Sequence, residues 1–255
     1  MNDRPISRRR LLGAGALGAG GLIVSGCDKL GGSTAFRSLL TGAEGLHMRS
    51  QRLLSGREGL AREFAEADMS PVFRANGNAE VADGAYRRHL AQGFAQWRLL
   101  VDGLVARPLA LPLEALVAMP QRQQITRHDC VEGWSAIGKW QGPHLSRLLD
   151  MAGLLPAARY IVFHCADRFG TRPYYESIDL VDAFHPQTIL AWRMNGQTLP
   201  LAHGAPLRLR VERQLGYKQA KYVMRIEARA SLAGLYGGKG GYWEDKSDYA
   251  WYAGI

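Results

Sequence analysis

The sequence of this 255-residue chain predicts a mixed α+β fold. Short apolar runs, some alternating with polar residues and some continuous, are typical of strands. A few other segments repeat their apolar residues with helical spacing, and they do not alternate regularly with the strands. This pattern predicts mixed sheets with short helices and argues against regular βαβ winding.

Residues 1–26 have the features of an export signal. A twin-arginine pattern at residues 7–12 leads into a weakly apolar, glycine-rich run at residues 11–24, which is short for a membrane-spanning helix. The run ends in small residues before Cys27, as at a lipoprotein cleavage site. We therefore predict a twin-arginine lipoprotein signal, a lipid on Cys27 and a location on the periplasmic side of the membrane. An uncleaved anchor or a cryptic signal is the alternative.

Net charge and export route narrow the expected partners. Removing residues 1–26 takes away four arginines and one aspartate, so the net charge falls from +9 to +6. No basic and aromatic recognition module is visible, so nucleic acid is not an expected partner. A basic protein suits an anionic cofactor, an anionic membrane surface or an acidic redox partner, although a solvated basic surface explains the charge equally well. The twin-arginine route carries folded proteins, which favours a cofactor inserted before export.

Residues 27–70 are expected to form a tether and a helical arm. A polar, glycine-rich stretch after Cys27 is typical of a linker. Leucines then recur in a loose helical stripe that glycines interrupt. The pattern predicts one or two helices that lie on a main domain of residues 71–255.

The elements of the main domain follow from local patterns. Strands are predicted, in chain order, at residues 97–101, 124–130 (strand or loop), 160–165, 207–211 and 222–226. Helices are predicted at residues 113–119 and 145–152, and Gly153 stops the second. In the fourth strand, apolar residues alternate with Arg208 and Arg210, which predicts a half-buried strand with arginines on its other face.

Cys130 lies in the most informative segment, residues 127–135, between titratable residues and Gly-Trp-Ser. With Cys27 lipidated, Cys165 is its one remaining partner, and two cysteines in an oxidising compartment commonly form a disulfide. A zinc or copper site that adds His128 and His164 is chemically feasible, but it lacks the spacing of structural zinc sites. The residues alone leave a disulfide, a metal ligand and a buried thiol open.

Several ordered segments together resemble one known family. They are, in chain order, Cys-Val-Glu-Gly-Trp-Ser at residues 130–135, Trp-Gln-Gly at 140–142, the leucine-rich 145–149, and segments 182–190, 195–200, 203–209 and 216–222. From about residue 97 to 228 the chain resembles the molybdopterin-binding domain of the sulfite oxidase superfamily. Within it, the chain is similar to bacterial methionine-sulfoxide reductase catalytic subunits.

This resemblance implies a sulfite-oxidase-type fold and a Mo-molybdopterin cofactor with one pyranopterin per molybdenum. It implies that Cys130 is the catalytic molybdenum ligand, and a soft thiolate suits a sulfur-ligated metal that keeps it deprotonated. Arg208 matches a family phosphate contact, although an exposed strand face is its alternative. The positions matched to cofactor contacts are Asn76, Cys165, His203, Arg208, Gln219, Ala220 and Lys221.

Three departures from the family pattern bear on the substrate. Cys165 stands where the sulfoxide reductases have a hydroxyl residue, and His203 replaces an asparagine while keeping a hydrogen-bond donor. Asp129 stands where relatives often have a basic residue. A carboxylate there would disfavour a doubly charged substrate such as sulfite, unless Asp129 pairs with Arg127 instead.

Two further sequence features, a histidine before a proline and two aromatic segments, each allow two interpretations. His185, followed by a proline, is expected to be part of a structural turn rather than a general base. The segments Tyr-Tyr-Glu at residues 174–176 and Tyr-Trp-Glu at 242–244 either line a substrate funnel or pack at a domain edge.

The predicted function is an exported oxidoreductase that transfers oxygen atoms in two-electron steps and reduces a sulfoxide or other small oxide, such as a methionine sulfoxide. No Cys-x-x-Cys-His haem motif is present, so a membrane haem protein or cytochrome is expected as redox partner. One alternative is oxidation of a sulfur or organic substrate with electrons passed to a cytochrome. Another, of a different class, is a cofactor-free, disulfide-stabilised surface binding module.

Overall fold

A computed structural model describes residues 33–255 of the chain. The predicted export signal and Cys27 lie outside the described residues. The chain divides into two compact units, Met1–Gln51 and Arg52–Ile255. Most of helix α2 (Thr34–Ser55) belongs to the first unit, so the predicted arm does contain a helix. Within the part of the chain that is described, no helix combines the length and apolar character needed to span a membrane.

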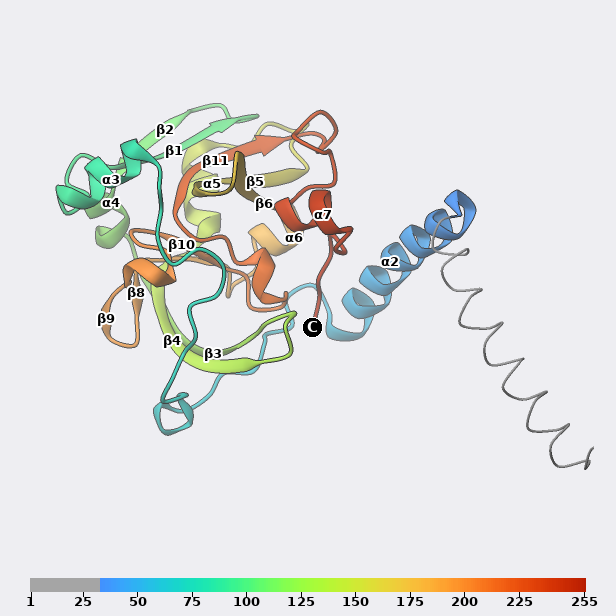
Figure 1. The fold of residues 1–255 in the computed structure, drawn as a ribbon, viewed down its shortest axis with the longest axis horizontal. Coiled ribbons are helices and arrows are strands. Elements are labelled where there is room, and N and C mark those ends of the chain that lie inside the picture. The colour runs from blue at the N-terminus through green and yellow to red at the C-terminus, as the bar shows by residue number, and fades with distance from the viewer. Residues whose placement is uncertain (1–32) are drawn as a thin grey trace, which may run out of the picture. The chain divides into compact units, whose positions relative to one another are not determined.

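A five-stranded sheet forms one layer of the second unit (Figure 1). Its strand order is β2 (Leu109–Pro112), β1 (Arg98–Gly103), β11 (Val223–Arg229), β5 (Tyr160–Phe169) and β6 (Arg172–Asp179). Strands β1 and β11 pair in parallel, and the other neighbours are antiparallel. Apolar side chains of this sheet pack on helix α5 (Leu145–Ala152) in the main core.

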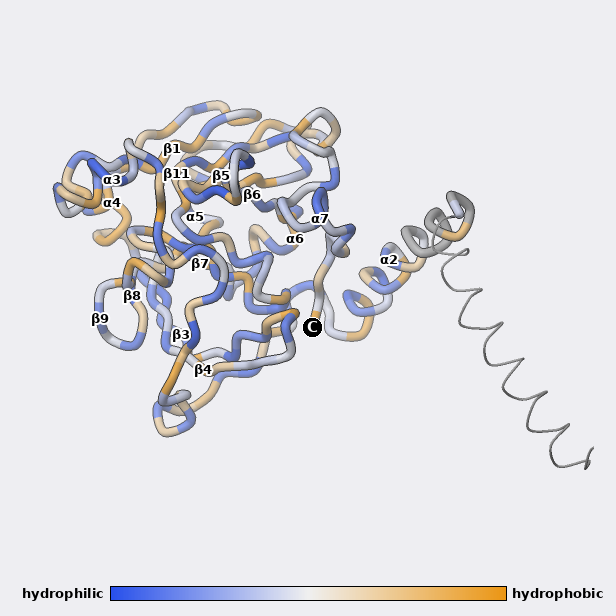
Figure 2. The backbone as a smooth tube through the Cα atoms, in the orientation of Figure 1, coloured by the Kyte–Doolittle hydropathy of each residue, from blue (hydrophilic) through white to orange (hydrophobic). Residues whose placement is uncertain are grey.

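Two smaller sheets form the other side of this unit. The four-stranded one has the order β3 (Gln121–Asp129), β4 (Ser135–Pro143), β8 (Arg193–Met194) and β9 (Gln197–Thr198), and the two-stranded one pairs β10 (Arg208–Arg210) with β7 (Ile189–Ala191). The long β3–β4 hairpin projects from the core as a curved ribbon (Figure 1). Figure 2 shows apolar and polar residues alternating along much of the chain, as expected for strands with one buried face.

The remaining helices are short. They are α3 (Gly84–Ala91), α4 (Leu113–Ala118), α6 (Leu180–Ala183) and α7 (Tyr242–Ser247), with single 3₁₀ turns η1 (Glu66–Asp68), η2 (Leu201–His203) and η3 (Gly216–Lys218). The predicted α+β class, with mixed sheets and short helices, is confirmed.

Helix α5 shows how closely a local pattern can determine an element. Its four predicted apolar positions are all buried, and Gly153 adopts a φ of +69° just after the last helical residue. A left-handed residue at this position is favourable for glycine because it lacks a Cβ. The amide of Gly153 also donates to the carbonyl of Leu149 and closes the helix.

Strand β10 differs from the prediction. The arginines were expected on an exposed face, but Arg208 is 5% exposed and Arg210 is fully buried. The reason is that β10 pairs with β7 beneath the β3–β4 hairpin, so both of its faces are covered. In β10, the alternation of arginine and leucine therefore corresponds to two buried faces, of which one is charged and the other apolar.

The core predicts the effect of one substitution in α5. Leu148 is fully buried, so Leu148→Ala should reduce the free energy of unfolding by roughly 2–5 kcal/mol, through lost burial and a residual cavity. Denaturant titration of the purified protein measures this change. Met151 on the same helix is 42% exposed, and Met151→Ala should change stability by no more than about 0.5 kcal/mol. Equal losses in the two variants would contradict this account of the core.

Candidate functional site

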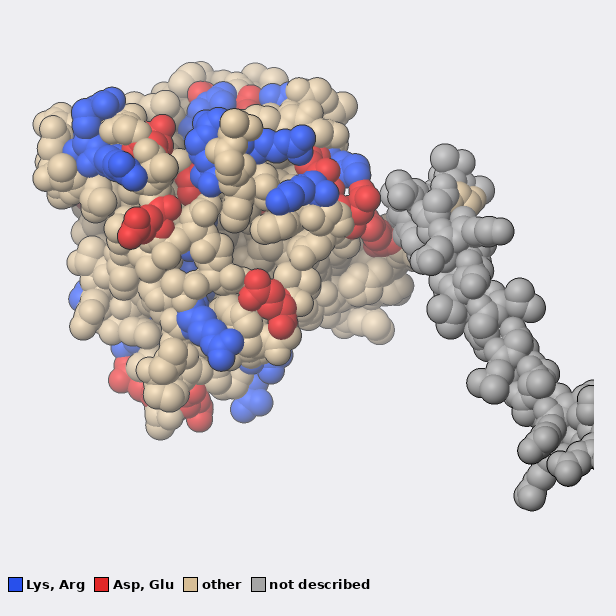
Figure 3. Space-filling view, in the orientation of Figure 1, with Lys and Arg blue, Asp and Glu red and all other residues tan. Residues whose placement is uncertain are grey.

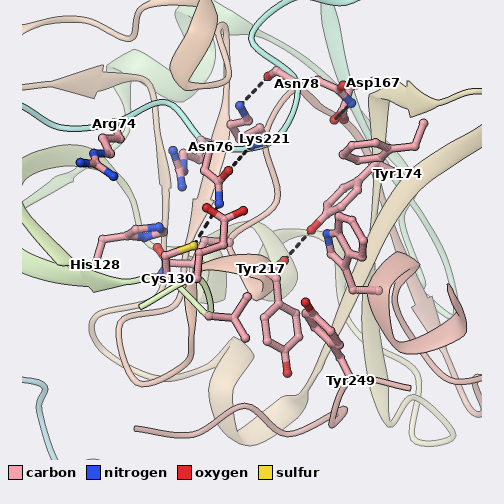
Figure 4. Close-up of a pocket in the computed structure, with 18 residues that line it drawn as sticks. Arg74, Asn76, Asn78, His128, Cys130, Asp167, Tyr174, Tyr217, Lys221 and Tyr249 are labelled. Atoms are coloured by element: carbon pink, nitrogen blue, oxygen red, sulfur yellow. Dashed lines mark hydrogen bonds between the residues drawn. The ribbon is translucent and has the colours of Figure 1, made fainter. Parts of the chain in front are cut away.

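One cavity of about 380 Å³ lies in the second unit, where β3, β10, β5 and β6 meet the segments around η3 and α7. Figure 4 shows its lining, with Cys130 and His128 on one side and a group of aromatic rings on the other. Three chemically distinct parts make up the lining. They are a single thiol, a group of buried polar and basic side chains, and an aromatic wall.

The thiol belongs to Cys130, in the turn that follows β3. The Cys130 amide donates to the Trp134 carbonyl at 2.9 Å, and the Gly133 amide donates to the Cys130 carbonyl at 3.0 Å. Gly133 has a φ of +85°, so a glycine suits this tight turn. The Asn76 side-chain amide donates to the Cys130 sulfur at 3.0 Å (Figure 4). The turn and Asn76 together fix the direction of the thiol.

Two of the three basic side chains that line the cavity, Arg208 and Lys221, are buried without a carboxylate partner, and the third, Arg74, is exposed. Arg208 donates to the carbonyl of His203 at 3.3 Å, and its Nε is buried with no hydrogen-bond acceptor. Lys221 Nζ donates to the carbonyls of Asn78 at 2.5 Å and Ala202 at 2.9 Å. Burial, followed by nearby positive charge, lowers the pKa of Arg208 to about 9 and that of Lys221 to about 7. Two like charges confined in this way favour an anionic ligand.

Two further polar groups of the lining have an oxygen with no partner. Asp167 accepts from the side-chain amide of Asn78 at 3.0 Å through Oδ2, while its buried Oδ1 has no donor. Burial raises the pKa of Asp167 to about 6. Gln219 donates to the carbonyl of Gln214 at 3.2 Å, and its Oε1 is buried and has no donor. Buried acceptors without donors are uncommon, and a ligand that carries N–H groups would satisfy them.

His128 is the functional candidate that the sequence did not single out as a cavity residue. It lies near the end of β3, two residues before Cys130, and both side chains line the cavity; its Nδ1 accepts from Arg210 at 3.1 Å. Burial lowers its pKa well below 6.5, and Arg210 and Arg208 lower it further. The ring is therefore neutral, and the Arg210 donor places its one proton on Nε2. Strand alternation alone could have placed His128 beside the thiol.

We call Tyr174, Tyr217, Trp243 and Tyr249 the aromatic wall, and the ring of Phe169, which also lines the cavity, lies 5.4 Å from that of Trp243. The rings of Tyr217 and Tyr249 are 5.1 Å apart, and those of Trp243 and Tyr249 are stacked at 5.8 Å. The Tyr174 hydroxyl donates to the Tyr217 carbonyl at 2.6 Å. Residues 174–176 and 242–244 were predicted either to line a funnel or to pack at a domain edge, and each segment does both. Tyr174 and Trp243 line the cavity, whereas their neighbours in the two segments are buried behind it.

The cavity brings together some of the predicted cofactor positions and not others. Those that line it are Cys130, Asn76, Arg208, Gln219 and Lys221. The three that do not line it are Cys165, His203 and Ala220. Ala220 is fully buried in the core, and burial lowers the pKa of His203 to about 4.

Both described cysteines are free thiols, so the predicted disulfide alternative is absent from residues 33–255. Cys165 lies half-buried in β5, and burial raises the pKa of its thiol. Within the same described range, no group of three His, Cys, Asp or Glu residues is arranged to hold a metal ion. The zinc or copper alternative therefore has no ligand set here.

The structure corrects the argument built on Asp129. Its carboxylate pairs with Arg127 Nε at 2.9 Å and accepts from the Ser135 hydroxyl, and it does not line the cavity. The expectation that Asp129 repels sulfite loses its basis, and the alternative pairing with Arg127 is the one observed. His185 is confirmed as part of a structural turn, since its Nε2 donates to the carbonyl of Gly59 and its Nδ1 accepts from the amide of Gln187.

The lowered pKa of Lys221 predicts that the stability of the cofactor-free protein depends on pH. Its pKa is lowered to about 7 in the folded chain from an ordinary value of 10.5, so between these values the unfolded chain binds more protons. Stability should therefore rise with pH from about 7 to 10. Denaturant midpoints at a series of pH values measure the slope. Lys221→Met should flatten it, whereas Lys246→Met, at an exposed lysine, should not.

Comparisons with known proteins show which family this chain is similar to. Residues 88–233, more than half of the chain, match the family described as the oxidoreductase molybdopterin binding domain. The chain is 46% identical over 160 residues (63% of this chain and 56% of the relative) to YedZ1 of Azospira oryzae, provisionally named a protein-methionine-sulfoxide reductase subunit. It is 33% identical over 152 residues (54% and 51%) to the protein-methionine-sulfoxide reductase catalytic subunit MsrP of Campylobacter jejuni.

A solved structure is also similar, the sulfane dehydrogenase SoxCD from Paracoccus pantotrophus. It has a TM-score of 0.49 and 24% identity, over 54% of this chain and 39% of that chain. The chain spans about half the length of the curated relatives it matches. The family match covers β1 to β11 and includes Cys130, Arg208 and Lys221. The chain thus belongs to the oxidoreductase molybdopterin-binding domain family.

Proposed function

We propose that this protein is a molybdenum–molybdopterin oxidoreductase that reduces a sulfoxide or another small oxide. The observation that carries the proposal is the joint exposure of one free thiol and two unpaired basic side chains to the same cavity. A thiolate suits a sulfur-ligated molybdenum, and the basic groups suit the phosphate of a pterin cofactor. The names of the two curated relatives support sulfoxide chemistry.

The lining residues fit the cofactor by their chemistry. Cys130 would ligate the metal, while Arg208 and Lys221 would bind the phosphate and thereby gain the counter-charge that they lack. The free oxygens of Asp167 and Gln219 would accept hydrogen bonds from the N–H groups of the pterin. Asn76, which already donates to the thiol, would orient the ligand sulfur. Cys165, His203 and Ala220 stay candidates for contacts just behind this lining.

When bound, the cofactor would supply two-electron oxygen-atom transfer. Reduction of a sulfoxide takes up two electrons and two protons and releases a thioether and water. Near neutral pH, Asp167 is able to hold or release a proton at the cavity, because its pKa is raised to about 6. The aromatic wall would pack against the alkyl groups of the substrate, and aromatic edges also contact sulfur favourably.

Location and partners follow from the sequence and the relatives. The features of residues 1–26 support export by the twin-arginine route to the periplasmic side of the membrane, with a lipid on Cys27 as anchor. One relative is named as a subunit and the other as a catalytic subunit, which supports a separate electron-transfer partner. We propose a membrane haem protein or cytochrome in that role.

The reverse reaction class is a second candidate, in which a sulfur or organic substrate is oxidised and its electrons pass to a cytochrome. One observation favours it. Asp129 is paired with Arg127 outside the cavity and so does not repel an anionic sulfur substrate, and Arg74, which lines the cavity together with Glu132, offers such a substrate a positive charge.

Substitution of Cys130 tests the proposal. Cys130→Ser, purified from a molybdopterin-competent host, should lose the thiolate signature of the metal and more than about 100-fold of its sulfoxide reduction with a reduced viologen dye. Elemental analysis and electron paramagnetic resonance report on the metal separately from turnover. Met151→Ala, at an exposed residue outside the cavity lining, is the control and should retain activity. Full turnover by Cys130→Ser would refute the proposed ligand.

A second test of the proposed cofactor site uses Gly216, whose backbone packs closely against His128. A Cβ on this residue would lie 2.5 Å from His128 Nε2, and the imidazole is fixed by Arg210 and cannot move away cheaply. Gly216→Ala should therefore displace η3 from β3 and lower the molybdenum content of the purified protein by about 10-fold or more. Gly45→Ala, where nothing lies within 4 Å of the added methyl group, should load molybdenum normally.

A further inference from the structure

A buried ion cluster lies directly behind the aromatic wall. Lys218 Nζ is 2.6 Å from Glu176 Oε2 and 2.5 Å from Glu244 Oε1, and none of the three side chains is exposed. The proposed chemistry does not use these charges. An isolated buried charge is strongly unfavourable, so the three groups depend on one another for their place in the core.

The cluster joins the three segments that build the wall. Glu176 lies two residues after Tyr174 on the same face of β6, Lys218 is next to Tyr217 in η3, and Glu244 follows Trp243 in α7. One ammonium group therefore bridges segments that are far apart in the sequence. Figure 4 shows the wall residues Tyr174, Tyr217 and Tyr249 across the cavity from Cys130.

Lys218 also compensates a repulsion between the two carboxylates. Burial and the Glu244 carboxylate raise the pKa of Glu176 well above its usual range. Glu176 Oε1 and Glu244 Oε2 find no hydrogen-bond donor among the described residues. Lys218 also lies over the ring of Trp251 at 5.6 Å, which packs it in place. Without the ammonium, β6 and α7 would carry facing acidic groups with nothing between them.

We propose that Lys218 is a positioning residue that holds the aromatic wall at its distance from Cys130 and so sets which oxides the cavity admits. The inference rests on the proposed function and names its substrate class, a small uncharged dialkyl sulfoxide that packs against aromatic rings. Trp243 and Tyr249 lie outside the matched residues 88–233. This side of the cavity is therefore built in part by a segment beyond the matched domain.

Steady-state kinetics of Lys218→Met in the full, molybdenum-loaded chain tests the inference. With reduced viologen as donor, the KM for dimethyl sulfoxide should rise about tenfold while kcat stays within about twofold, because wall packing contributes to binding rather than to the metal chemistry. The preference for dimethyl sulfoxide over the larger methyl phenyl sulfoxide should shrink. Lys139→Met is the matched control, since Lys139 pairs with Glu66 away from the cavity. An unchanged KM and an unchanged preference would overturn the inference.

Hydrogen exchange separates this inference from the proposed function. In Lys218→Met, amides of residues 214–219 and 241–250 should exchange faster, while those of β11 stay protected. Equal protection of residues 241–250 in both proteins would overturn the positioning role. If the wild-type enzyme reduces no sulfoxide, the proposed function is refuted. The hydrogen-exchange comparison would then still show whether Lys218 holds the aromatic wall in place.

If Lys218→Met does not fold, a second variant serves the same measurements. Glu176→Gln, Lys218→Met and Glu244→Gln together remove every charge of the cluster and leave none unpaired, which buried sites tolerate better. This triple variant should show the same faster exchange of residues 241–250 and the same rise in KM. A wild-type exchange pattern and KM in the triple variant would overturn the inference.

Discussion

Arg210 and Glu212 form a fully buried ion pair at the point where the two-stranded sheet meets the β3–β4 hairpin. Two hydrogen bonds of 2.9 and 2.6 Å join the guanidinium to the carboxylate, and the guanidinium lies 4.2 Å over the ring of Trp140. From this pair Arg210 reaches His128, and Gln124 of β3 donates to Glu212 at 2.8 Å. Removing one partner of such a pair costs roughly 3–5 kcal/mol, because the other charge is left buried alone. The pair thus fixes β10 against β3 and, through β3, the position of the cysteine turn.

The same strand carries one buried arginine with a carboxylate partner and one without. Arg208 and Arg210 lie two residues apart on one face of β10, both over the ring of Trp140. Arg210 has Glu212 as its carboxylate partner, whereas Arg208 has only a carbonyl acceptor. Burying a cation without a counter-ion is unfavourable, and an anionic ligand would recover that cost. An unpaired arginine beside a paired one is therefore a physical sign of a binding site. The basic side chains on the face seen in Figure 3 are instead interspersed with acidic ones.

Local periodicity was sufficient for elements that bury one apolar face. Helix α5 and strands β1 and β5 lie where the pattern of apolar residues placed them. It was insufficient for β10, because period-two alternation shows that two faces differ and does not show that one of them is exposed. For residues 128–130, the alternation of an extended strand could have predicted the lining correctly. It directs His128 and Cys130 to one side and Asp129 to the other, as the cavity shows.

The parts of the site that depend on long-range contacts could not be read from the sequence. Cys130 stood out by its own surroundings, but its role and those of Arg208 and Lys221 were inferred from ordered motifs shared with a family, and their meeting in one cavity required the fold. The sequence gave no sign that Lys218 would meet two acidic residues, although all three lie in segments that local patterns had singled out. The members of this cluster come from residues 176, 218 and 244, and nothing near any one of them indicates that it is buried.

The parallel pairing of β1 with β11 has a consequence for biosynthesis. Residue 100 pairs with residue 225, so the central strand order of the large sheet cannot form until more than two hundred residues have left the ribosome. Contacts so distant in sequence also form slowly. The cavity draws its lining from residue 74 to residue 249, so a nascent chain that has not reached residue 249 lacks part of it. A complete cavity for the cofactor therefore requires synthesis to have passed residue 249, and until β11 has been made the edge of β1 that pairs with it stays open.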